Sequence, residues 1–235
     1  MHIKLTTCRI SLLSLLLVIS ISISRAGSTT FPPLSPNAVE GKLSNGLRYI
    51  LVPTTNQSHK IEMRMIMRIG SLVEDEEQRG CAHFLEHLAF EGTKHFPNRT
   101  MIQAFEAQGM KYGRDINAFT GFDRTIYSLS LPITSAQQRS EILQLALHSA
   151  SDWLGDIDIS KSHVENEKGT IIEELRSYTL PDDFYTLKIG TGRYSKRMPL
   201  GSEQEIKAVT PKALLQYYNK WYKPYNATII IVGDV

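Results

Sequence analysis

Apolar and polar residues alternate in two segments of this chain. Residues 61–69 carry Ile or Met at every odd position, with Glu62, Arg64 and Arg68 between them, and residues 125–131 repeat the alternation with Tyr and Leu. A period of two is typical of a strand that buries one face and exposes the other. Both segments are therefore predicted to be half-buried strands.

Two further strands are predicted from local signals. Residues 47–53 follow Asn45-Gly46, a dipeptide that favours a hairpin turn. Residues 227–232 (ATIIIV) form a continuous and largely β-branched run, which is typical of a strand buried on both faces. Because such a strand needs neighbours to cover it, we expect the domain to be incomplete at the C-terminus of the chain.

Capping residues and apolar stripes predict three helices. The first begins after Thr134 or Ser135. Its apolar stripe includes Ile142, Leu145, Ala146 and Trp153. The others cover residues 160–178 and 211–222, the last with Pro211 at its first position. Helices and hairpin-like strands alternate irregularly, so the predicted class is α+β, with a mainly antiparallel sheet packed against helices.

Composition and charge narrow the class of function. The chain is 42% hydrophobic and 21% charged, which indicates an ordered globular protein. The first 26 residues contain Lys4, Arg9 and Arg25 and no acid, and without them 23 basic and 24 acidic residues remain, a net charge of −1. A nearly neutral chain offers no electrostatic surface for nucleic acid or an anionic membrane. No nucleic-acid partner is expected.

The first 26 residues have the pattern of an export signal. Lys4 and Arg9 precede an apolar run over residues 11–24, and Ser24-Arg25-Ala26 places small residues ahead of a cut before Gly27. The run is shorter than the roughly 20 residues of a spanning helix, although signal peptides and retained membrane anchors overlap in length. We expect an exported protein, periplasmic or secreted, with no stable membrane anchor after signal cleavage.

These observations divide the chain into three parts. Residues 1–26 form the signal peptide, and residues 27–40, rich in Ser, Thr and Pro, form a flexible lead-in. Residues 41–235 form the folded domain.

The strongest chemical signal is the pentapeptide His83-Phe84-Leu85-Glu86-His87. On a helix, residues four apart lie above one another, so both imidazoles would face one point, and neutral imidazole is a good Zn²⁺ ligand. Zinc lowers the pKa of bound water toward ~7, and Glu86 can take its proton as the water attacks a carbonyl. The H-x-x-E-H order is a zinc-peptidase signature. The alternative interpretation is a solvated helix face that binds no metal.

A catalytic zinc site needs a third protein ligand and an open position for water. Residues 164–175 (VENEKGTIIEEL) offer four candidates, Glu165, Glu167, Glu173 and Glu174. Seven helical residues turn through about 700°, so Glu167 and Glu174 share a face. One of this pair would ligate the metal and the other would orient a ligand or the water. The spacing does not choose between them.

Other side chains that can bind metals have simpler interpretations. Removal of the signal would take Cys8 away and leave Cys81 alone, so no internal disulfide is expected and Cys81 is interpreted as a core residue. His95 is interpreted as a surface residue, and His148 as a residue on a helix flank.

Four stretches of the chain carry a family pattern in order. They are GSLVEDEEQRGCAHFLEHLAFEGTKHFP (70–97), DINAFTGFDRTIYSL (115–129), NEKGTIIEELR (166–176) and YNATIIIVGDV (225–235). Together they resemble the N-terminal, metal-bearing domain of the insulinase/pitrilysin family of zinc peptidases, in particular its exported bacterial members. The resemblance implies that His83, His87 and Glu174 ligate one Zn²⁺ ion. It also implies that Glu86 is the general base and Glu167 a supporting acid.

The same resemblance implies a mode of substrate binding and a partner. Asn117, Ala118 and Phe119 would lie on an edge strand to which an extended peptide adds as a further strand. Family enzymes pair this domain with a C-terminal half, so a C-terminal half or a second similar domain is expected to be required.

The leading hypothesis is a zinc endopeptidase domain that cleaves extended peptides or unfolded polypeptide segments. The alternative is a non-catalytic subunit that binds peptides or assembles with a larger peptidase. A third hypothesis, a metallohydrolase for small amides or esters, uses the same zinc chemistry.

Overall fold

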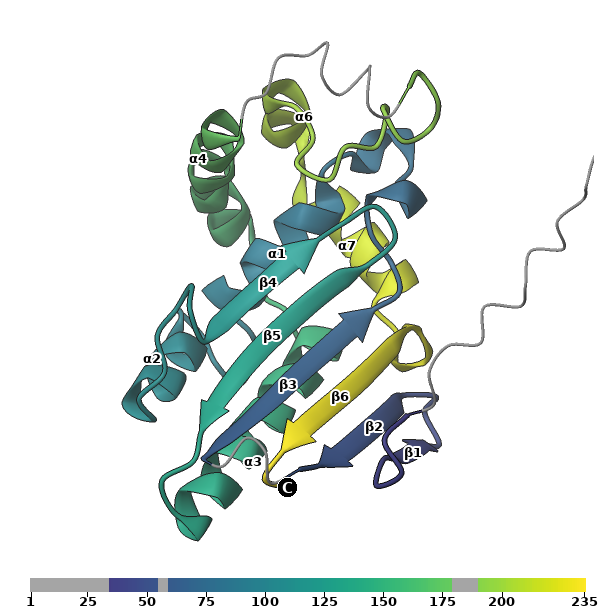
Figure 1. Cartoon of the computed structure of the whole chain (residues 1–235). Coiled ribbons are helices and arrows are strands. Elements are labelled where there is room, and N and C mark those ends of the chain that lie inside the picture. The colour runs from purple at the N-terminus through teal and green to yellow at the C-terminus, as the bar shows by residue number, and fades with distance from the viewer. Residues whose placement is uncertain (1–33, 55–58, 179–189) are drawn as a thin grey trace, which may run out of the picture. The chain divides into compact units, whose positions relative to one another are not determined.

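Six strands form one sheet in the order β1-β2-β6-β3-β5-β4 (Figure 1). The computed structural model describes residues 34–54, 59–178 and 190–235, so the expected signal peptide lies outside it. The strands are β1 (Val39–Lys42), β2 (Arg48–Pro53), β3 (Lys60–Met67), β4 (Ile116–Thr120), β5 (Thr125–Pro132) and β6 (Ala227–Gly233). β2 and β6 run parallel, and the other neighbouring pairs are antiparallel. The sheet is mainly antiparallel, as predicted, and the parallel pair of β2 and β6 makes it a mixed sheet.

The predicted helices form, and each begins at a capping residue. They are α3 (Ala136–Gly155), α4 (Lys161–Ser177) and α7 (Pro211–Trp221), and the hydroxyls of Ser135, Ser160 and Thr210 accept hydrogen bonds from backbone N–H groups at their first turns. The helix expected to carry the H-x-x-E-H sequence is α1 (Cys81–Glu91). The structure adds α2 (Thr100–Ala107), α6 (Glu203–Ala208) and the short 3₁₀ helices η1 (Ser71–Val73), η2 (Glu76–Gln78) and η3 (Pro224–Asn226). In Figure 1, α1, α3 and α7 lie behind the sheet.

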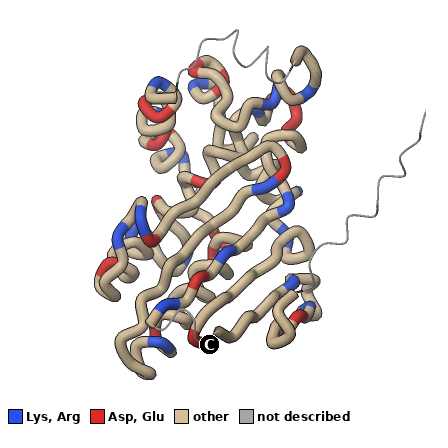
Figure 2. Tube along the Cα trace, viewed as in Figure 1, with Lys and Arg blue, Asp and Glu red and all other residues tan. Residues whose placement is uncertain are grey.

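The buried face of the sheet is the one behind which α1, α3 and α7 lie (Figure 1). On β3 the residues Ile61, Met63, Met65 and Met67 are at most 1% exposed, whereas the residues between Ile61 and Met67 remain partly exposed. The open face carries both signs of charge on β3 and no charge on β6 (Figure 2). β5 and β6 alternate between buried and partly buried residues in the same way.

One strand differs from the sequence-based expectation. Burial of residues 227–232 on both faces was expected, but on β6 only every second residue is buried, and Ile230 is partly exposed. The interior position of β6 in the sheet explains its apolar run. β2 and β3 pair with the two edges of β6, and their side chains flank Ile230 on the open face.

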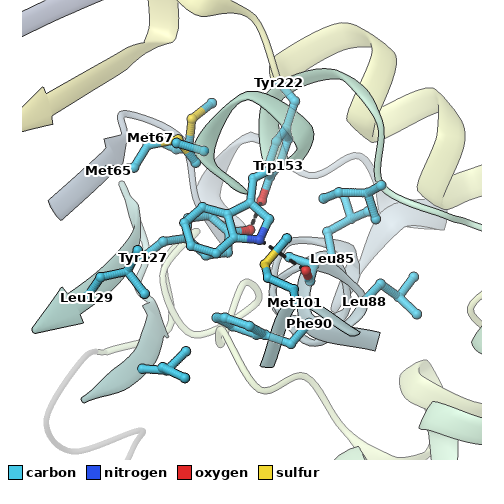
Figure 3. Close-up of a cluster of buried hydrophobic side chains, with 14 of the residues drawn as sticks. Met65, Met67, Leu85, Leu88, Phe90, Met101, Tyr127, Leu129, Trp153 and Tyr222 are labelled. Carbon is cyan, nitrogen blue, oxygen red and sulfur yellow. Dashed lines mark hydrogen bonds between the residues drawn. The ribbon is translucent and has the colours of Figure 1, made fainter. Parts of the chain in front are cut away.

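The core is centred on Trp153, which joins α3 to α1 and to the sheet (Figure 3). Its ring is fully buried and stacks on Tyr127 of β5, with the ring centroids 4.6 Å apart. The indole N–H donates to the carbonyl of Ala89 in α1 at 3.0 Å. The Tyr127 hydroxyl lies 2.9 Å from the hydroxyl of Tyr222, at the end of α7. These contacts fix α1 against the buried face of the sheet.

The lead-in expected over residues 27–40 extends too far. β1 begins at Val39 and pairs with β2, so Val39 and Glu40 belong to the sheet. Both are exposed on an edge strand, which explains why no hydrophobic alternation marks them in the sequence. Cys81 is buried and unpaired, as expected. Among the described helices, none has the length and apolarity to cross a membrane.

Candidate metal centre

The helix that carries the H-x-x-E-H sequence is held at its N-terminus by a buried carboxyl group. Gly80 precedes α1 with a φ of 84°, in the left-handed region that favours glycine. Glu74, which is 1% exposed, accepts hydrogen bonds from the N–H groups of Gly80 (3.1 Å) and Ala82 (2.9 Å). The acidic stretch before the helix therefore satisfies N–H groups that have no partner inside the helix.

His83 and His87 lie one turn apart on α1, and their Nε2 atoms face each other at 3.3 Å. Glu174, from the last turn of α4, places its Oε2 atom 3.0 Å from His87 Nε2 and 3.6 Å from His83 Nε2. His83 is 6% exposed, and its pKa is lowered because burial and the neighbouring His87 both disfavour a proton on its ring. The structure thus brings two imidazole nitrogens and a carboxylate oxygen to one point.

This arrangement fits a tetrahedral zinc ion. With metal–ligand bonds of about 2.0–2.1 Å, the ligand atoms of a tetrahedral site lie about 3.3 Å apart, and the three separations here are 3.0, 3.3 and 3.6 Å. Two imidazole nitrogens and a carboxylate oxygen are also among the donors that zinc prefers. The donor atoms of His83, His87 and Glu174 therefore have the chemistry and the spacing of a three-ligand zinc site.

Glu167 contacts the other ring nitrogen of His87. Its Oε1 atom lies 2.9 Å from His87 Nδ1, and its side chain is nearly buried. In neutral His87, a proton on Nδ1 that is donated to Glu167 would leave the lone pair of Nε2 directed at His83 and Glu174. Although burial opposes a charge on His87, hydrogen bonds to Glu167 and Glu174 raise its pKa to about 9.

The other two glutamates of this segment point elsewhere. Glu165 pairs with Lys168 at 3.0 Å and Glu173 pairs with Arg176 at 2.6 Å, and both glutamates are exposed. The structure therefore distinguishes the four candidates: Glu174 reaches the Nε2 atoms and Glu167 reaches Nδ1.

Glu86 lies on the same helix, beside the histidines, with 9% of its surface exposed. The hydroxyl of Thr120, at the end of β4, donates to its Oε2 atom. Burial raises the pKa of Glu86 to about 7, against the opposing effects of the Thr120 hydrogen bond and the charge of His87. A carboxyl group with a pKa close to neutral can both accept and release a proton.

The motif is part of a wider sequence similarity. The family model of Insulinase (Peptidase family M16) matches residues 49–183, which is more than half of the chain. The chain belongs to the insulinase family.

Relatives of this insulinase-family chain carry descriptions that refer to zinc. Two proteins described as "Probable zinc protease PqqL", from Haemophilus influenzae and Escherichia coli, are 38% and 34% identical to it over 208 residues. Each match covers 86% of this chain and 22% of the relative. The crystal structure of the first half of the periplasmic protease PqqL from Escherichia coli is 34% identical, with a TM-score of 0.77, covering 87% of this chain and 44% of that one. The family resemblance inferred from the motifs is confirmed. This chain spans 22% of the length of the two PqqL relatives.

In this M16 domain a cavity of about 480 Å³ opens over the candidate centre. Its wall includes His83, Glu86, His87 and Glu174 together with the four β4 residues Asn117, Ala118, Phe119 and Thr120. The predicted metal-binding and substrate-binding residues therefore share one cavity, while Glu167 lies behind His87.

β4 forms one edge of the sheet, with β5 as its strand neighbour. Gly121 N–H bonds to the Arg124 carbonyl, so by antiparallel alternation Phe119 and Asn117 direct their peptide groups at β5. Ala118 then directs its N–H at the free edge, where the Asn117 side chain accepts it at 2.8 Å.

Sequence reasoning missed several residues of the cavity. Thr120 bonds to Glu86 across a large sequence separation, and no short motif joins them. The apolar wall contributed by Met198, Pro199 and Leu200 has no chemical signature and is placed only by the fold.

Proposed function

We propose that this chain is the zinc-binding domain of an endopeptidase that cleaves extended peptides. The observation that carries the proposal is the convergence of His83 Nε2, His87 Nε2 and Glu174 Oε2 beside the buried carboxyl group of Glu86. The description of the PqqL relatives as zinc proteases supports the choice of metal and reaction.

The roles of the protein groups follow from their contacts. When bound, zinc would polarise the scissile carbonyl and make a water molecule more acidic. Thr120 holds Glu86 Oε2, which leaves Oε1 to take a proton from the attacking water and to deliver it to the leaving amine. Glu167 fixes the orientation and the tautomer of His87 through Nδ1.

The edge strand β4 would bind the substrate. A peptide that runs along β4 can accept a hydrogen bond from the outward N–H of Ala118, which now donates to the Asn117 side chain. Because β4 borders the cavity of the candidate centre, such a peptide would pass beside Glu86 and the histidines. Backbone hydrogen bonds of this kind accept many sequences, and the side chains that line the cavity would supply preference.

We also infer that the working enzyme is exported and larger than this domain. The chain spans 22% of the PqqL relatives, so a C-terminal half or a second similar domain would supply the remaining substrate-binding surface. Export agrees with the signal-like residues 1–26 and with the periplasmic location stated for the Escherichia coli relative.

The central test replaces Glu86 by Gln in the natural protein that carries this chain. E86Q should retain zinc, measured by elemental analysis, and should lose hydrolysis of internally quenched peptides, because Gln cannot take the proton. The matched control is E77Q, which changes an exposed glutamate of η2 and should leave both properties unchanged. Hydrolysis that survives in E86Q, and that zinc chelation still abolishes, would show that another group is the base.

A non-catalytic peptide-binding subunit is the second candidate, favoured by the small share of the relatives that the chain spans. It predicts that the natural protein binds zinc and peptide without cleaving the peptide. The same assay separates the two candidates, because hydrolysis by the unsubstituted protein that is lost in E86Q excludes the non-catalytic one.

A further inference from the structure

A second cluster of potential metal ligands lies apart from the residues discussed so far. It consists of His95, which follows α1, and of His148 and Asp152 on α3, whose donor atoms all lie within 4.8 Å of one another. The two imidazole rings have their centroids 4.8 Å apart. It shares no residue with the centre formed by His83, His87 and Glu174.

Asp152 holds a fixed orientation in this cluster. It has no exposed surface, and its Oδ2 atom accepts hydrogen bonds from the Thr93 hydroxyl (2.5 Å) and from the backbone N–H of His95 (3.2 Å). Its Oδ1 atom faces both histidines, at 2.8 Å from His95 Nδ1 and 3.9 Å from His148 Nε2. One oxygen is thus anchored in the fold, and the other is presented to two imidazoles.

A hydrogen bond between His95 and Asp152 explains their separation of 2.8 Å, but it does not explain the position of His148. The separation of 3.9 Å between His148 Nε2 and Asp152 Oδ1 is too long for a hydrogen bond. His148 and Asp152 nevertheless stand one helical turn apart on α3, so both side chains leave the same face of that helix. The distances of 2.8 and 3.9 Å lie on either side of the about 3.3 Å that separates the ligands of a tetrahedral ion.

We propose that His95, His148 and Asp152 bind a second transition-metal cation, of which Zn²⁺ is the first to test. Two imidazoles and one carboxylate select an ion such as Zn²⁺, Co²⁺ or Ni²⁺ over Ca²⁺ or Mg²⁺, which take oxygen ligands. The side chains of His95 and His148 are 43% and 50% exposed, so the ion reaches them from solvent and water completes its coordination.

The ion would connect two parts of the chain. His95 lies in the segment that leaves α1, the helix of the catalytic motif, and the other two ligands belong to α3. A cation bound across this junction stabilises the folded protein, and the gain in the free energy of unfolding rises with the logarithm of one plus the ratio of its concentration to its dissociation constant. This inference is independent of the proposed function, because the cluster shares no residue with the catalytic cavity.

The test counts Zn²⁺ ions bound per untagged chain by isothermal titration. The unsubstituted protein should bind two ions and H148Q one, while H83A/H87A, which removes the first centre, should also bind one. The matched control is H163Q, because His163 pairs with one carboxylate, Asp158, at 3.3 Å. H163Q should still bind two ions.

Co²⁺ gives a second readout that does not depend on H83A/H87A being folded. The visible absorption of Co²⁺ titrated into the unsubstituted protein should show two binding steps, and H148Q should lack one of them. Equal metal stoichiometry in H148Q and the unsubstituted protein would overturn the second site, and so would an equal loss in H163Q. A failed second site leaves the E86Q result untouched.

Discussion

Glu167 Oε1 lies 2.9 Å from His87 Nδ1, although the two residues belong to different helices, α4 and α1. When His87 is neutral, a proton donated from Nδ1 to this nearly buried carboxylate would leave Nε2 free to bind a metal. Glu174 approaches the opposite nitrogen of the same ring at 3.0 Å. One imidazole is thus held between two carboxylates of α4, each of which meets a different ring nitrogen.

The first prediction concerns Glu167. E167Q should lower zinc affinity by about 10–100-fold, because the amide orients His87 less strongly than the carboxylate does. Competition with a chromogenic chelator measures the affinity. E165Q, an exposed neighbour on the same helix, should change it little. An affinity in E167Q equal to that of E165Q would contradict the orienting role.

The second prediction concerns the third ligand. E174A should lose zinc from the centre of His83 and His87, because two imidazoles alone leave the ion without its carboxylate ligand. E173A changes the adjacent residue, which points to Arg176, and should retain the metal. Elemental analysis after gel filtration compares them. Full zinc occupancy in E174A would remove Glu174 from the ligand set.

A third prediction follows from the pKa of Glu74. Burial raises it to about 8, above the ordinary value of 4.5, despite two backbone hydrogen bonds and the charge of Arg197. Between these values the folded protein holds a proton that the unfolded chain has released, so the contribution of Glu74 to stability falls as pH rises through this window. The fall is at most about 1.4 kcal/mol for each pH unit.

Urea unfolding in the presence of a chelator tests this pH dependence. E74Q cannot titrate, so the unsubstituted protein should lose stability relative to E74Q as the pH rises from about 4.5 to about 8. The comparison cancels the groups that titrate in both proteins. A stability difference that does not change with pH would show that the carboxyl group is already ionised across this range.

A fourth prediction concerns the core. W153F should lower the free energy of unfolding by about 1–3 kcal/mol, since it removes the hydrogen bond to Ala89 and leaves space beside Tyr127. W221F replaces a partly exposed tryptophan at the end of α7 and should cost less. Denaturant titration measures both. Equal losses would mean that the link between α3 and α1 adds little stability.

Much of the fold could be predicted because its signals are local. The alternation of Met63 and Met65 with charged residues identified β3 and its buried face, and the hydroxyls of Ser135 and Thr210 marked the starts of helices. β1 escaped prediction because an exposed edge strand buries too little to leave a pattern.

The residues of the candidate site could be predicted from the sequence, except where the packing of one element on another determines which atoms meet. The helical spacing brought Glu167 and Glu174 to one face of α4, but only the rotation of α4 against α1 assigns one to Nδ1 and the other to Nε2 of His87. Thr120 could not be foreseen for the same reason, since it meets Glu86 through the packing of β4 on α1.

The contact between Asn117 and Ala118 has a consequence for solubility. An exposed sheet edge with unpaired peptide groups invites strands of other molecules to add to it, which leads to aggregation. The Asn117 side chain covers the outward N–H of Ala118 and in turn donates to the Gly113 carbonyl at 3.2 Å. A single rotation of this side chain would uncover the N–H of Ala118. The edge is therefore shielded until an incoming strand binds strongly enough to displace the side-chain amide of Asn117.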